Sequence, residues 1–95
     1  MMYGFAQQRK QMLEAELERL KIEMPPLGAM RVALTGDLAV SRVTPETSLD
    51  LGIVQATDEK FHRRADFWTT HLRPRLDTNF IVYTPEEYEE LVDTD

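Results

Sequence analysis

One segment sets the expected fold of this 95-residue chain: Leu34-Thr35-Gly36-Asp37-Leu38-Ala39-Val40-Ser41-Arg42-Val43-Thr44-Pro45-Glu46-Thr47-Ser48-Leu49-Asp50. An apolar run at residues 30–34 leads into it and predicts a short strand, and Gly36 predicts a turn at the end of that strand. A short helix, a turn at Pro45 and a second strand that opens with Ser48-Leu49-Asp50 are expected to follow. The segment therefore predicts two strands joined by a turn and a short helix.

Helical patterns flank this segment on both sides. Residues 5–23 form an amphipathic pattern that ends at Pro25-Pro26, and its apolar positions are Ala6, Leu13, Leu17, Leu20 and Met24. Residues 58–72 predict another helix, capped by Thr57 or Asp58, with an apolar stripe made of Phe61, Ala65, Trp68 and Leu72. Residues 79–83 predict a third strand, and the capping box Thr84-Pro85-Glu86-Glu87 predicts a terminal helix.

These elements predict a single domain that spans residues 1–95. Their order is helix, strand, short helix, strand, helix, strand, helix. This order favours an α/β or α+β fold, with a three-stranded sheet and its helices packed on one face.

Composition narrows the classes of partner. The 17 acidic and 11 basic residues give a net charge of -6, which disfavours nucleic acid as a partner. Bases gather at residues 60–75 and both ends are acidic, so these stretches predict solvated helix faces or a contact with another protein. The absence of cysteine excludes disulfides and thiolate chemistry. With no run that resembles a signal peptide or a membrane span, we expect a cytoplasmic location and no membrane contact.

The pattern around Gly36 and Asp50 resembles the signature of the minimal, single-domain (MNT-type) members of the polymerase-β-like nucleotidyltransferases. In that family Gly-Ser-x-Ala-Arg-Gly is followed, after a spacer, by Asp-x-Asp. The similarity covers residues 30–91. It implies a core of order αβαβαβα with a small mixed sheet, a triphosphate at the Gly-Ser turn and Mg²⁺ held by three carboxylates.

Only part of that signature is retained when it is carried over position by position. Gly36 matches the glycine, and Asp37 replaces the serine that binds phosphate, so these two are the expected nucleotide-binding positions. Asp50 matches the second aspartate and is the expected catalytic and metal-binding residue. Ser48 replaces the first aspartate, and Asn79 replaces the third carboxylate. One of three expected metal-binding carboxylates therefore remains.

The substitutions leave two alternatives for the site. Asp37 places a negative charge where a triphosphate would lie, a repulsion of about 4 kcal/mol at 4 Å and an effective dielectric near 20. A working site would need Asp37 or Asp77 to join Asp50 as a metal ligand, and Arg42 to replace the arginine lost at position 40. Otherwise Asp37 serves as a helix N-cap and Gly36 as a turn glycine.

Two functions of different classes follow from the resemblance. The first is a catalytically degenerate nucleotidyltransferase-fold protein that needs no cofactor. It would act like an antitoxin by binding a small helical partner of the HEPN type, or a second copy of itself. The alternative is an active Mg²⁺-dependent enzyme that transfers a nucleoside monophosphate from a nucleoside triphosphate to a protein or small-molecule acceptor. A metal-free nucleotide sensor is a third possibility, which Asp37 argues against.

Overall fold

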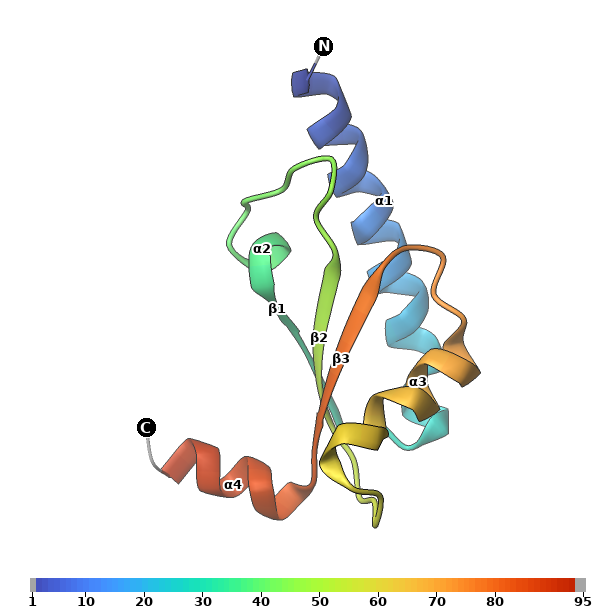
Figure 1. Cartoon of the computed structure of the whole chain (residues 1–95), viewed down its shortest axis with the longest axis vertical. Helices are drawn as coiled ribbons and strands as arrows, with labels where there is room; N and C mark the ends of the chain where they lie inside the picture. The colour runs from blue at the N-terminus through green and yellow to red at the C-terminus, as the bar shows by residue number, and fades with distance from the viewer. Residues whose placement is uncertain (1, 94–95) are drawn as a thin grey trace.

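The structure, a computed structural model, describes residues 2–93, and its helices surround a small sheet (Figure 1). The helices are α1 (Met2–Glu23), α2 (Gly36–Ala39), α3 (Arg64–Leu72) and α4 (Pro85–Asp93). The strands are β1 (Arg31–Thr35), β2 (Leu49–Val54) and β3 (Thr78–Tyr83), with 3₁₀ turns η1 (Pro25–Leu27) and η2 (Phe61–Arg63) between elements. The expected order of elements and the α+β class are confirmed. Among the helices of residues 2–93, none has the length and apolarity that a membrane crossing requires.

The three strands form one mixed sheet in the order β1-β2-β3. β1 runs antiparallel to β2, and β3 runs parallel to β2. The connection from β2 to β3 passes through η2 and α3, since parallel neighbours need a long crossover. The register places Thr35 opposite Asp50 and Asp50 opposite Asn79. Residues from three distant parts of the chain therefore form one row across the sheet.

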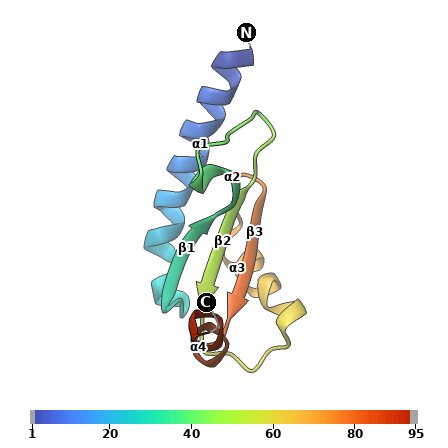
Figure 2. The same cartoon turned by 90° about the vertical axis from the view of Figure 1, so that its left-hand side faces the viewer.

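The core lies between one face of the sheet and the helices α1 and α3 (Figure 2). The helical side of this core consists of Leu13, Leu17, Leu20, Met24, Trp68 and Leu72, and the strand side consists of Leu49, Leu51, Ile53, Phe80 and Val82. Burying each of these side chains contributes about 1.5–3 kcal/mol, so this layer dominates the stability of the fold. Of the apolar positions expected for the first helix, Leu13, Leu17 and Leu20 on α1 and Met24 just after it are confirmed as core residues, whereas Ala6 is not part of the core.

Helix α4 lies on the opposite side of the sheet from α1 and α3 (Figures 1 and 2). The capping box fixes its start, because the Thr84 N–H donates to Glu87 Oε1 at 2.8 Å and the Glu87 N–H donates to Thr84 Oγ1 at 3.2 Å. Arg31 Nη1 on β1 donates to the Tyr88 hydroxyl at 2.7 Å and ties the helix to this second face. The capping box is confirmed, whereas the prediction that all helices pack on one face is wrong for α4.

Helix α3 begins later than its sequence pattern indicates. Thr57 Oγ1 accepts a hydrogen bond from the Glu59 N–H at 3.1 Å and closes a turn ahead of η2, so it does not cap a helix. Phe61, in η2, is 53% exposed and lies outside the core. Trp68 is fully buried, and its indole N–H donates to Gln55 Oε1 at 3.1 Å. The predicted helix at residues 58–72 is therefore correct only in its second half.

Two charged side chains that the pattern assigned to solvated faces are buried instead. Glu16 on α1 accepts from Arg19 Nε at 2.8 Å and also from the backbone N–H of Arg75. The Arg19 guanidinium lowers the pKa of the Glu16 carboxyl, against the opposing effect of burial. Arg64 on α3 donates to Glu87 Oε1 at 2.6 Å, which lowers the pKa of Glu87 and joins α3 to α4. Each buried charge has a hydrogen-bonded partner, which offsets the cost of removing it from water. The Glu16 contact joins α1 to the segment that contains Arg75, and the Arg64 contact joins α3 to α4.

Candidate functional site

The row Thr35–Asp50–Asn79 lies where β1 ends and where β2 and β3 begin. Strand side chains alternate between faces, so this row faces away from the core formed with α1 and α3. Asp50 is half-buried, whereas Thr35 and Asn79 are exposed. The Thr35 hydroxyl also donates to the Asp50 carbonyl at 3.3 Å. The structure thus brings together Asp50 and Asn79, two of the positions that the sequence singled out.

Gly36 lies directly against the Asp50 side chain. Its φ of 74° belongs to the left-handed region that favours glycine. A Cβ at position 36 would overlap Asp50 Oδ2 and lie 3.0 Å from both Asp50 Cβ and Cγ. Position 36 therefore requires glycine both for its backbone conformation and for the close approach of the Asp50 carboxylate.

The second oxygen of the Asp50 carboxylate is held by Asn79. Asn79 Nδ2 donates to Asp50 Oδ1 at 2.8 Å across the parallel strand pair. A hydrogen bond to a charged group contributes about 1.5–3 kcal/mol when it is shielded and less when it is exposed. Oδ2 of the Asp50 carboxylate thus lies against Gly36, and Oδ1 accepts a hydrogen bond from the side-chain amide of Asn79.

Asp37 is exposed in the first turn of the four-residue helix α2. The N-cap position belongs to Thr35, so the prediction that Asp37 caps this helix is wrong. The Asp37 carbonyl accepts from the Arg42 N–H at 2.8 Å, which closes the turn after α2. The Arg42 side chain is exposed.

Ser48 and Asp77 each lie immediately before one strand of the parallel pair β2 and β3. Asp77 is exposed and precedes β3, and its carbonyl accepts from the Leu49 N–H at 2.9 Å. Ser48 is half-buried and precedes β2. Across residues 2–93, no three His, Asp or Glu side chains are grouped so that they could hold a metal ion.

The loop that enters β2 is ordered by contacts that the sequence pattern did not reveal. Thr47 is buried, and its Oγ1 accepts from the Thr44 N–H at 2.8 Å. Arg9 of α1 donates to the Thr47 carbonyl at 2.9 Å, although 38 positions separate the two residues. A Thr-x-x-Thr spacing is a local turn signal that could have been recognised, whereas the Arg9 contact depends on how α1 packs. The loop therefore fixes where β2 begins, and with it the positions of Ser48 and Asp50.

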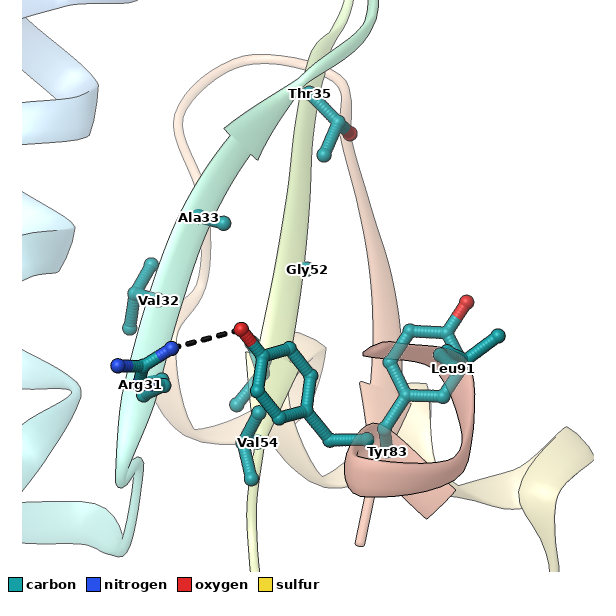
Figure 3. A pocket seen from close by; sticks show the side chains of 10 residues that line it. Arg31, Val32, Ala33, Thr35, Gly52, Val54, Tyr83 and Leu91 are labelled. Atoms are coloured by element: carbon teal, nitrogen blue, oxygen red, sulfur yellow. Dashed lines mark hydrogen bonds between the residues drawn. The ribbon is translucent and has the colours of Figure 1, made fainter. Parts of the chain in front are cut away.

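A groove of about 500 Å³ lies beside this row, between the open sheet face and α4 (Figure 3). Its floor includes Ala33 and Gly52, and its wall includes Tyr88 and Leu91. Figure 3 shows the Ala33 and Thr35 side chains on the groove side of β1, with Val32 on the side that faces α1. Arg31 lies at the edge, with its guanidinium carbon 5.4 Å from the centre of the Tyr88 ring.

Comparisons of this chain with protein-family models, with curated proteins and with solved structures found no match.

Proposed function

We propose that this chain is a catalytically inactive nucleotidyltransferase-like domain that acts by binding a partner protein. The observation that carries the proposal is the 2.8 Å hydrogen bond from Asn79 Nδ2 to Asp50 Oδ1. In the family that the sequence resembles, the position of Asn79 is a carboxylate that shares metal ions with Asp50. Here an amide donor occupies that position and contacts the aspartate directly.

The relation to the polymerase-β-like core is itself part of the proposal. It is supported by the order of the elements and by the mixed sheet with strand order β1-β2-β3. The contact between Gly36, at the end of β1, and Asp50, on β2, supports it further. These are the places at which the signature puts its glycine and its second aspartate.

The chemistry of the remaining groups argues against metal-assisted transfer. A hydrated Mg²⁺ is bound mainly through carboxylates together with substrate phosphates, and Ser48 and Asn79 add no charge to Asp50. A cation at Asp50 would also compete with the Asn79 hydrogen bond. Asp37 is exposed, so its repulsion of a phosphate 4 Å away lies between about 1 kcal/mol in water and about 4 kcal/mol near a protein surface. The proposed role therefore needs no cofactor.

The proposed partner is a small helical protein of the HEPN type, which this chain would bind as an antitoxin-like protein. Exposed apolar side chains on the side of the sheet away from the core support a protein contact, since such patches mark interaction sites. Ile81 is 47% exposed, and Leu91 and Val92 on α4 are 48% and 55% exposed.

The test is Mn²⁺ binding measured by electron paramagnetic resonance on the wild-type chain and on the double variant Ser48→Asp/Asn79→Asp. The double variant restores the carboxylates of the signature, so it should bind Mn²⁺ at submillimolar metal while the wild type does not. Thr69→Asp/Thr70→Asp adds the same two charges at exposed positions of α3 and serves as the control. Wild-type binding that Asp50→Ala removes would instead support the active enzyme.

A further inference from the structure

The groove between the open sheet face and α4 has a lining that is mostly apolar. Its floor is low, because Ala33 and Gly52 contribute only a methyl group and a hydrogen. A Cβ built on Gly52 would meet its nearest neighbours at 4.0 Å, so the space above it is open. A volume of about 500 Å³ with apolar walls and a few polar groups is typical of a site for a small molecule.

Arg31 supplies the charge of this lining. In the part of the chain that the structure describes, no Asp or Glu lines the groove and no carboxylate forms an ion pair with Arg31. Its Nη1 donates to the Tyr88 hydroxyl at 2.7 Å, and its guanidinium carbon lies 5.4 Å from the centre of the Tyr88 ring (Figure 3). A guanidinium carries further N–H donors in a planar fork, so Arg31 is held in place while it can still bind an anion.

A single positive charge favours a ligand with one negative charge. A carboxylate carries one charge and matches the planar fork of a guanidinium, whereas a phosphate monoester carries about 1.5–2 charges. The additional charge of a phosphate would be unbalanced in a chain whose net charge is -6. The lining therefore favours a carboxylate over a phosphate.

The acids of the neighbouring elements do not line the groove. Asp50 is paired with Thr35, at the opposite end of β1 from Arg31. β1 has five residues, so these two ends are about 13 Å apart at ~3.3 Å per step. This separation exceeds the Debye length of about 8 Å at physiological ionic strength, beyond which exposed charges are largely screened. α4 contributes Tyr88 and Leu91 to the lining, and its five acids are not part of it.

Aromatic side chains make the groove suited to a ring system. Tyr83 and Tyr88 both line it, and Leu91, which is 48% exposed, adds an aliphatic wall. Aromatic rings pair in offset or edge-to-face arrangements, which stabilise a complex beyond the effect of the area buried. At Ala33 and Gly52 no large side chain stands between a flat ring and the strands.

We propose that this groove binds a small aromatic carboxylate. The carboxylate of the ligand accepts from the Arg31 guanidinium, and its ring system lies over Ala33 and Gly52 beside Tyr88. This site goes beyond the proposed function and does not depend on it, because neither Gly36 nor Asp50 lines the groove.

The test is titration calorimetry of the wild-type chain at pH 7 with para-phenylbenzoate and with its neutral amide, para-phenylbenzamide. The two probes have the same rings and differ in charge. The benzoate should bind at submillimolar concentration, and its affinity should fall as the salt concentration rises. The amide should bind about tenfold or more weakly, because it cannot form a charge-assisted hydrogen bond with Arg31.

Two substitutions separate the charge of the groove from its shape. Arg31→Gln should weaken binding of the benzoate by about tenfold or more and leave binding of the amide unchanged. Arg42→Gln removes the same charge from an exposed position outside the lining and is the matched control. Gly52→Val fills the floor and should weaken binding of both probes. Gly4→Val should weaken neither, because Gly4 lies on α1 with no atom within 4 Å of an added Cβ.

Equal affinity of the wild type for the two probes, or no binding of the benzoate, would overturn the assignment. Unchanged affinity for the benzoate in Arg31→Gln or in Gly52→Val would overturn it as well. Sedimentation of the wild-type chain tests a competing occupant, since a dimer that Gly52→Val dissociates would show that a second copy fills the groove instead. None of these results depends on Mn²⁺ binding at Asp50, so the groove and the proposed function are tested separately.

Discussion

The contact between Gly36 and Asp50 gives the sharpest quantitative prediction. Gly36→Ala is expected to lower the free energy of unfolding by about 3 kcal/mol. Of this, about 1–2 kcal/mol comes from placing a side chain at a φ of 74°. The rest arises because the new Cβ would overlap Asp50 Oδ2, so that Asp50 turns away and loses the Asn79 hydrogen bond.

The two contributions separate in a double-mutant cycle. In an Asp50→Ala background the overlap with the carboxylate is gone, so Gly36→Ala should cost only its backbone strain and the 3.0 Å approach to the Cβ at position 50. We expect a coupling energy of about 1–2 kcal/mol between the two substitutions. Urea denaturation followed by circular dichroism measures it, with the fluorescence of buried Trp68 as an independent probe.

Gly28→Ala provides the matched control for this cycle. Gly28 also has a positive φ, 115°, but a Cβ there would meet only Gln55 Nε2 at 3.6 Å. It should therefore be strained without any coupling to Asp50→Ala. If Gly36→Ala costs the same in both backgrounds, the Asp50 carboxylate does not lie against Gly36 and the site geometry is wrong.

Two further predictions concern single carboxylates. Glu16→Gln should cost about 1.5–3 kcal/mol at pH 7, since it replaces a buried carboxylate that accepts from Arg19 and from the Arg75 N–H. Because the folded-state pKa of Glu16 is lowered, its contribution is complete above the unfolded pKa of about 4.3 and is lost as the pH falls through the folded value. Urea titrations should therefore show the difference between wild type and Glu16→Gln shrinking from pH 7 to acid pH, and a constant difference would count against the account. Asn79→Asp places a second carboxylate opposite Asp50, and two facing negative charges repel each other, so the melting temperature of this variant should fall below that of wild type at pH 7. Equal melting temperatures at pH 7 would contradict the observed hydrogen bond.

The sequence predicts the order of the helices and strands and singles out Asp50 and Asn79, but it misplaces the start of α3. Period 3.6 in α1 and the capping box at Thr84 and Glu87 are local patterns, and local patterns decide where helices form. The placement of Asp50 beside Asn79 followed from the resemblance to a known signature. The sheet register then brings the two side chains within a hydrogen bond.

The features that escaped prediction depend on tertiary packing. Glu16 and Arg64 look like any other charged residue of a helix, and only the arrangement of α1, α3 and α4 buries them. The side of the sheet that α4 takes depends on the contact of Tyr88 with Arg31, which lies 57 positions away in the chain. The predicted start of α3 is wrong because Thr57 closes a turn with Glu59 instead of capping a helix.

Transfer of labelled nucleotide tests the central claim most directly. Purified wild-type chain, incubated with Mg²⁺ and each α-labelled nucleoside triphosphate together with a cell extract as a source of acceptors, should add no more label than a parallel reaction with Asp50→Ala. Incorporation that requires the wild-type chain and disappears with Asp50→Ala would show that this altered site still performs nucleotidyl transfer.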